Sequence, residues 1–154
     1  MSIFEYDKEK EEKKELSLRT FFMSQPVGEG INIEHGKRMR EKFQGDFVRF
    51  SGYNRMTDGT VASTKGDLLE PYEGTNMHCS IQVDYPMIEK EVQLADENGF
   101  RYSLHAQGDG AVHKVAGIFD KCQKKDGKLV NRHAVTDMEF SNCLLYTSDA
   151  ADDK

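Results

Sequence analysis

The feature of the sequence that most constrains the fold is an alternation of strand and helix signals between residues 86 and 140. Pro86 suits the first position of a helix, and Asn98-Gly99 supplies a left-handed stop after it. A strand is predicted over 100–105, a helix after Gly108-Asp109-Gly110, and another strand over 130–140. Strands separated by helices in this way form parallel βαβ units, so we expect an α/β fold.

Both predicted helices carry apolar residues at helical spacing, which indicates that one face of each is buried. These residues are Ile88, Val92 and Ala95 in the first helix, and Val112, Val115, Ala116, Phe119 and Cys122 in the second. We expect the second helix to close at Asp126-Gly127.

The N-terminal half gives weaker signals. The charged run from Asp7 to Glu15 predicts a solvated loop or helix surface, and residues 16–22 predict a strand. Residues 24–45 predict a loop with one helical turn near 38–42. A second strand is expected from Phe47 toward Met56, followed by a long loop over 57–72 that contains Asp58-Gly59.

Composition narrows the function classes. The chain has 154 residues and a formal net charge of -6, with no basic stripe to neutralise phosphates, which argues against nucleic-acid binding. It contains no run of about 18 apolar residues, so no membrane span is expected. Three cysteines without a CxxC pair suit a reducing compartment, and a cytoplasmic location is the default expectation.

His105 is the first candidate for chemistry, because it ends a predicted parallel strand just before a Gly-Asp turn. In α/β folds that edge of the sheet is where ligands bind, and an imidazole there can ligate a divalent metal. The alternative is a structural or merely polar histidine. Asp109 either orients His105 or caps the following helix.

Three further polar residues have two interpretations each. Asp58 either accepts a hydrogen bond from a substrate or forms the turn that Asp-Gly favours. His133 and Asp137, four residues apart on the last predicted strand, are expected to share a face. They are either two groups of a site or a salt link at the end of the strand.

The C-terminal segment differs from the rest. Residues 143–153 look like a translated sequencing-library adapter, and the alternative is a genuine acidic tail. We therefore expect residues 1–141 to be a fragment of one domain and residues 142–154 to be a non-native tail.

Three motifs, in order, resemble the amidohydrolase superfamily, in particular the family 3 type that includes N-substituted formamide deformylases and imidase-like proteins. Residues 104–112 are similar to its His-Ala-x-Gly-Asp-x-Ala signature. Residues 56–60 and 68–72 match an Asp-Gly loop that ends in Leu-x-Glu-Pro-Tyr. Residues 131–137 are similar to a strand bearing Arg-His-x-Ile-x-His.

The resemblance implies a partial TIM-type (β/α) barrel, covering roughly the third to sixth strands, with a divalent metal, usually zinc. It implies that His105 is the metal ligand from the fifth strand and places Asp137 where the sixth-strand ligand stands. The fourth-strand lysine position falls on Asn54, or on Arg49 in another register, and neither can form a carbamate. We therefore expect one metal at most, with Asp58, Asp109, His133 and Asn54 near it or near the substrate.

The function that follows from the resemblance is hydrolysis of a C–N bond in a small amide-like substrate by a metal-activated water. The isolated fragment is expected to be inactive, because the proton-transfer Asp of the family lies outside it. The alternative is a barrel that has lost catalysis and serves as a binding or structural module. The sequence carries no signal for the substrate or the oligomeric state.

Overall fold

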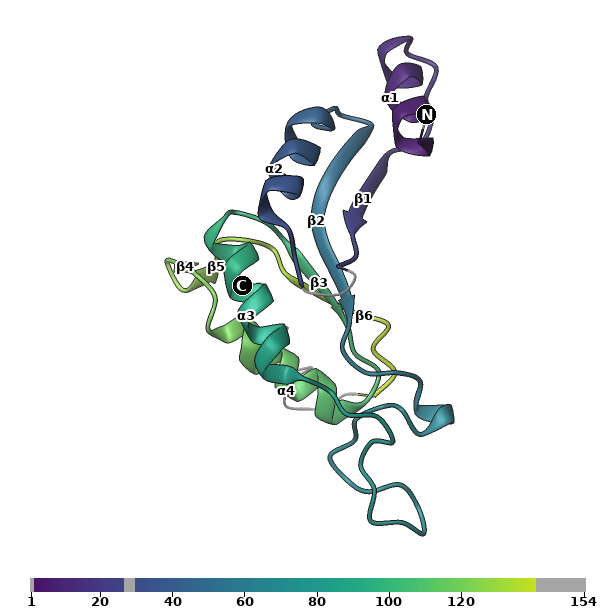
Figure 1. The fold of residues 1–154 in the computed structure, drawn as a ribbon, viewed down its shortest axis with the longest axis vertical. Helices are drawn as coiled ribbons and strands as arrows, with labels where there is room; N and C mark the ends of the chain where they lie inside the picture. The colour runs from purple at the N-terminus through teal and green to yellow at the C-terminus, as the bar shows by residue number, and fades with distance from the viewer. Residues whose placement is uncertain (1, 27–29, 141–154) are drawn as a thin grey trace.

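A computed structural model describes residues 2–26 and 30–140 and shows a parallel sheet with helices packed against it (Figure 1). The sheet has four strands in the order β1-β2-β3-β6, and each neighbouring pair is parallel. The strands are β1 (Thr20–Ser24), β2 (Val48–Met56), β3 (Tyr102–His105) and β6 (Ala134–Thr136). The α/β class expected from the alternating pattern is confirmed for this part of the chain.

The connecting elements are helical. They are α1 (Ile3–Glu12), α2 (Ile33–Lys42), the short 3-10 turn η1 (Val61–Ser63), α3 (Tyr85–Glu97) and α4 (Asp109–Asp120). A small antiparallel hairpin, β4 (Lys124–Lys125) and β5 (Lys128–Leu129), follows α4. Within the described residues, every helix falls short of the length and apolar character needed to cross a membrane.

The α3–β3–α4 unit forms where the sequence predicts it. The Asp84 side chain accepts a hydrogen bond from the backbone N–H of Met87 at 3.0 Å and caps α3, which begins one residue before Pro86. Gly99 follows α3 with a φ of 70°, as the Asn-Gly stop requires. Val92, Ala95, Leu104 and Val115 are fully buried, so the predicted apolar stripes do form the core.

The loop predicted for residues 24–45 is wrong, because a ten-residue helix, α2, occupies 33–42. Asn32 caps it by accepting from the backbone N–H of His35 at 2.8 Å. Gly36 then allows close packing on β2, since a Cβ there would lie 2.1 Å from the Tyr53 hydroxyl. The helix is rich in charged residues and therefore lacks the apolar periodicity that marks α3 and α4.

Two other boundaries are corrected. The strand predicted over 130–140 is limited to Ala134–Thr136, and Asp137 leaves it with a φ of 58°. The second helix ends at Asp120 rather than at Asp126-Gly127. Those two residues instead form the turn of the β4–β5 hairpin, with φ values of 53° and 78°, as a tight hairpin turn requires.

An irregularity in β2 keeps its aromatic residues on one face. Phe22 pairs with Phe50 and Met23 pairs with Gly52, so Ser51 is an extra residue in β2. The bulge puts Phe50 and Tyr53, three positions apart, on the same side of the sheet. Their rings meet edge to face at 6.0 Å, and both pack on Phe100.

Gly52 tests this packing. Its φ is 124°, and a Cβ would lie 2.0 Å from the carbonyl oxygen of Arg101 on the neighbouring chain segment. We expect Gly52→Ala to lower the free energy of unfolding by about 3 kcal/mol or more, as measured by urea denaturation. Gly117→Ala is the matched control, because a Cβ at this exposed position of α4 meets nothing within 4 Å. The control should raise stability by about 0.5–1 kcal/mol. Equal effects of the two substitutions would contradict the strain at Gly52.

Candidate functional site

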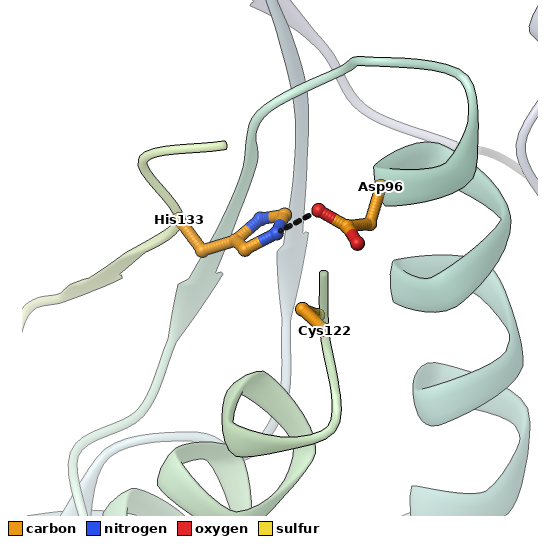
Figure 2. Close-up of side chains that lie close together, drawn as sticks. All are labelled: Asp96, Cys122 and His133. Carbon is orange, nitrogen blue, oxygen red and sulfur yellow. Dashed lines mark hydrogen bonds and ion pairs between the residues drawn. The ribbon is translucent and has the colours of Figure 1, made fainter. Parts of the chain in front are cut away.

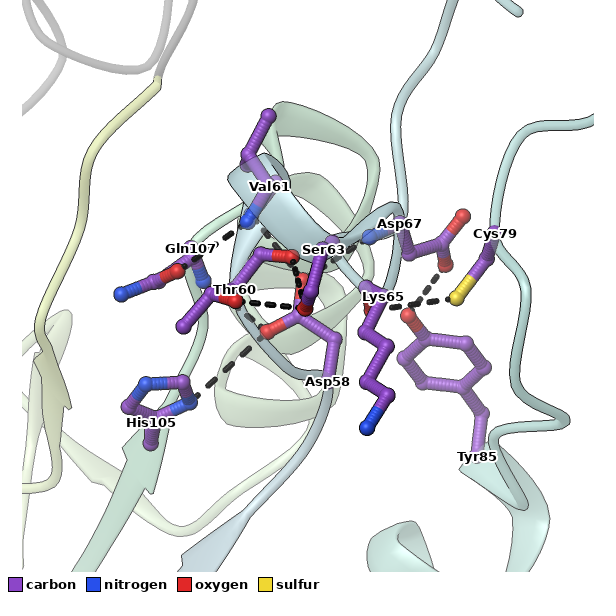
Figure 3. A network of polar contacts seen from close by, with 12 residues as sticks. Asp58, Thr60, Val61, Ser63, Lys65, Asp67, Cys79, Tyr85, His105 and Gln107 are labelled. Atoms are coloured by element: carbon purple, nitrogen blue, oxygen red, sulfur yellow. Dashed lines mark hydrogen bonds and ion pairs between the residues drawn. The ribbon is translucent and has the colours of Figure 1, made fainter. Parts of the chain in front are cut away.

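The candidate site lies at the carboxyl ends of the two central strands (Figure 3). His105 is the last residue of β3 and pairs with Met56, the last residue of β2. Asp58 follows β2 by two residues, and its Oδ1 lies 3.8 Å from Nδ1 of His105. The Asp58 side chain is fully buried, and the His105 side chain is 12% exposed. The sequence candidates His105 and Asp58 are therefore neighbours in space.

Asp58 is held by three backbone N–H groups. Its Oδ1 accepts from Gln107 at 2.9 Å, and its Oδ2 accepts from Gly108 and Asp67, also at 2.9 Å. A buried carboxylate needs such partners, because removing its charge from water without them is costly. Asp58 lies at a bend after β2, and its buried side chain ties the end of β2 to the end of β3.

The two faces of the sheet carry different groups. The Arg55 guanidinium donates to both carboxylate oxygens of Glu91 on α3, at 2.7 and 2.8 Å, and Tyr102 donates to the same side chain. These residues point toward the helices. Because side chains alternate along a strand, Asn54 and His105 point to the opposite face of the sheet. The structure thus brings Asn54 to the same face as His105.

Two buried polar atoms at this edge have no hydrogen-bond partner among the described residues. They are Nδ1 of His105 and Oγ1 of Thr57, which lies between β2 and Asp58. Buried polar groups are nearly always hydrogen-bonded, so two buried atoms without partners mark this strand end as a candidate binding site. Thr57 is a site residue that the sequence did not single out.

Asp67 fixes the loop that follows Asp58. Its Oδ2 accepts from Lys114 Nζ at 2.7 Å and from the Tyr85 hydroxyl, so the loop is joined to α3 and α4. Burial, with help from the Asp67 carboxylate, raises the pKa of Tyr85 far above its ordinary value, so this hydroxyl stays a donor. The Gly-Asp-Gly motif at residues 108–110 was the sequence signal that could have revealed the close approach of this loop. A Cβ at Gly108 or Gly110 would lie 2.1 or 2.8 Å from the Asp67 carbonyl oxygen.

Asp109 neither caps α4 nor touches His105. The N-cap of α4 is Gly108, which makes no side-chain cap. The Asp109 Oδ1 instead accepts from the backbone N–H groups of Leu69 and Gly110, both at 2.9 Å. The cap expected from the sequence is wrong, and Asp109 helps to hold the loop in place.

His133 lies at the opposite edge of the sheet, near the amino end of β3 (Figure 2). Its Nδ1 accepts from the backbone N–H of Tyr102 at 3.1 Å, and its Nε2 lies 2.9 Å from Oδ1 of Asp96. Its ring stacks on Phe119 with centroids 5.0 Å apart. Since Nδ1 is an acceptor, Nε2 carries the proton that is donated to Asp96.

Asp96, Cys122 and His133 bring potential ligand atoms within 4.8 Å of one another, yet they do not suit a metal. Both ring nitrogens of His133 are engaged. Burial, with the nearby Asp96 carboxylate, raises the pKa of the Cys122 thiol to about 11. Asp96 also accepts from Asn131 and from the backbone of Gln123, both at 2.7 Å. This cluster is a satisfied structural network.

Asp137 is exposed and follows β6, with a left-handed backbone. Its pairing with His133 on one strand face does not form, because β6 covers only Ala134–Thr136 and both residues lie outside it. A role for Asp137 as a metal ligand remains a prediction.

Among the described residues at this edge, His105 is a candidate to hold a metal. It presents an imidazole with an unpaired nitrogen at a strand end, whereas the Asp58 oxygens already accept three N–H groups. Asp58 is therefore suited to support a ligand rather than to be one.

The network at His133 predicts a loss of stability when the imidazole is removed. We expect His133→Ala to lower the free energy of unfolding by about 3 kcal/mol, because Asp96 and the Tyr102 N–H lose a buried partner. Urea denaturation measures this effect, and His113→Ala, at an exposed position, is the control. A change below about 0.5 kcal/mol would show that the network contributes little.

The lowered pKa of Asp96 predicts how the free energy of unfolding changes at acid pH. Burial raises the pKa of Asp96, but the hydrogen bonds from Asn131, Gln123 and His133 outweigh it and bring the pKa below the ordinary 3.8. A lowered pKa stabilises the fold above pH 3.8, and this contribution is lost as the pH falls through the folded-state value. In Asp96→Asn, the free energy of unfolding should fall less steeply below pH 3.8 than in the unsubstituted chain. Parallel curves would contradict this assignment.

No protein-family model and no curated protein matches the sequence. Two solved structures share its fold, both of uncharacterized metal-dependent hydrolases. The one from Pyrococcus furiosus has a TM-score of 0.58 and 20% identity, over 84% of this chain and 26% of that chain. The one from Pyrococcus horikoshii OT3 has a TM-score of 0.54 and 20% identity, over 75% of this chain and 24% of that chain. The chain thus spans about a quarter of the length of either structure and has the fold of that part.

Proposed function

We propose that this chain is part of a metal-dependent hydrolase that cleaves a C–N bond in a small amide-like substrate. The observation that carries the proposal is His105, at the carboxyl end of a central parallel strand, with a buried carboxylate beside it. The two structures with the same fold are of uncharacterized metal-dependent hydrolases, which supports metal-dependent hydrolysis as the kind of reaction. The three sequence motifs favour the amidohydrolase type and a TIM-type barrel.

The residues of this chain would act as follows. His105 would hold a divalent metal, for which zinc is the proposed identity, and Asp58 would keep the imidazole in place. When bound, such a metal polarises a carbonyl group and lowers the pKa of a water molecule. Thr57 would offer its unpaired hydroxyl to the substrate. Asn54, on the face of His105, cannot become a carbamate, which favours a site with one metal. Asp137 and residues outside the chain would supply further ligands.

A second function is a barrel without catalysis that serves as a binding or structural module. The observations in its favour are Asn54 at the position where the family carries lysine, and the exposed place of Asp137 beyond β6. This alternative predicts that the fold persists without metal and that the longer protein turns over no amide.

The test uses the longer protein that contains this segment, loaded with zinc and given a panel of small amides. We expect His105→Ala to remove bound zinc, measured by elemental analysis, and to lower kcat/KM by more than about 100-fold. His113→Ala, on the exposed side of α4, should change neither quantity. Unchanged zinc content in His105→Ala would sink the proposal. A parent protein that binds no metal and cleaves no amide would support the module instead.

A further inference from the structure

We propose that Gln107 is a specificity-determining residue that donates its side-chain amide to an oxygen of the substrate. This oxygen is a hydrogen-bond acceptor, a carbonyl or a carboxylate, that lies beside the scissile bond. The inference rests on the proposed function and adds a substrate class to it: small amides that carry a second acceptor oxygen.

The backbone of Gln107 is fixed on both sides. The residue follows β3 by two positions, and its N–H donates to Asp58 Oδ1 at 2.9 Å. Its carbonyl oxygen accepts from the N–H of Phe140, beyond β6, at 3.1 Å. The segments that follow β2 and β6 therefore set its position, at the edge of the sheet where His105 lies.

A backbone N–H group also fixes the direction of the side-chain amide. Oε1 of Gln107 accepts from the N–H of Val61, the first residue of η1, at 3.3 Å (Figure 3). A backbone N–H can only donate, so the amide end next to Val61 is the oxygen and the opposite end is the NH2 group. An ordinary surface glutamine has no such contact to hold it.

The NH2 group of Gln107 is free to donate. Within residues 2–26 and 30–140, Nε2 makes no hydrogen bond, and it is not one of the buried atoms without a partner, so a ligand can reach it. The amide and the imidazole of His105 lie on the same side of Asp58 (Figure 3). An NH2 group offers two donors and no acceptor, so its partner must supply an acceptor.

Apolar side chains lie on the segment that is bonded to Gln107. Met138 and Phe140 follow β6 and are 47% and 51% exposed, and the N–H of Phe140 makes the bond to Gln107. A few fixed polar groups among apolar side chains are the usual composition of a small-molecule site. This setting favours a small organic molecule as the partner of the amide.

The substrate oxygen that Gln107 binds is a second one. In the proposed function the scissile carbonyl lies at His105, which leaves the donors of Gln107 for another oxygen of the same molecule. An amide without that oxygen leaves the donors unpaired when it displaces water. We therefore expect kcat/KM for such an amide to be lower on the order of 10-fold.

Gln107→Glu is the variant that isolates the two donors. It keeps an oxygen for the N–H of Val61 and leaves both backbone hydrogen bonds in place, so the fold should be retained. It replaces the NH2 group with an oxygen that repels an acceptor. Gln44→Glu is the matched control, because it makes the same change of charge at an exposed position just before β2, at the amino edge of the sheet.

The kinetic test gives the longer, zinc-loaded protein three amides of nearly equal size. N-acetylglycine carries a carboxylate, N-acetylglycinamide a second carbonyl, and N-isobutylacetamide no second oxygen. We expect kcat/KM for at least one of the first two to exceed that for the third on the order of 10-fold, and the better of the two identifies the oxygen. Gln107→Glu should abolish the preference, and Gln44→Glu should keep it. A preference that survives Gln107→Glu, or equal turnover of all three amides, would overturn the inference.

Binding is measured separately on the 154-residue chain, from the ¹⁵N–¹H signals of its glutamine side chains. The Gln107 signals, identified by their loss in Gln107→Glu, should shift with an oxygen-bearing amide and not with N-isobutylacetamide. The Gln44 signals should respond to neither. No shift at Gln107 would overturn the inference even if the longer protein is a hydrolase. A shift, together with a longer protein that binds no zinc and cleaves no amide, would support the binding role and remove the proposed reaction.

Discussion

The structure at the carboxyl edge of the sheet depends on one buried carboxylate. Asp58 carries a charge into a place without solvent, and the fold must surround it with donors. The donors are backbone N–H groups at 67, 107 and 108, so the path of the long loop and the start of α4 are both set by this residue. Gly108 is part of the same constraint, because only a residue without a Cβ fits against Asp67.

A carboxylate and an imidazole lie together at each end of the strands, and the two pairs differ in how completely their hydrogen bonds are satisfied. His133 uses both ring nitrogens, stacks on Phe119 and has a fully buried side chain. His105 is partly exposed and leaves Nδ1 without a partner. The amino edge is satisfied and therefore structural, whereas the carboxyl edge has spare bonding capacity. This contrast is the reason that the proposed function uses His105 rather than His133.

The sequence predicted those parts of the fold that depend on residues close together in the chain. The apolar spacing of α3 and α4, the Asn98-Gly99 stop and the position of His105 at a strand end all follow from neighbours in the sequence. α2 was missed because a capping residue and the contact of Gly36 with Tyr53 define it, rather than an apolar stripe. The environments of Asp58 and His133 were missed because their partners lie 9 to 50 and 31 to 37 positions away.

The separation of the two edges has an evolutionary consequence. The stabilising network of Asp96 lies at one end of the strands and His105 at the other. Substitutions around the candidate site therefore need not destabilise the fold. Asp58 is the exception, since it serves both purposes at once. Proteins that share this segment should therefore tolerate substitutions around Thr57 and Asn54, whereas Asp58 and Gly108 should stay unchanged. Substrate specificity can then change while the fold is kept.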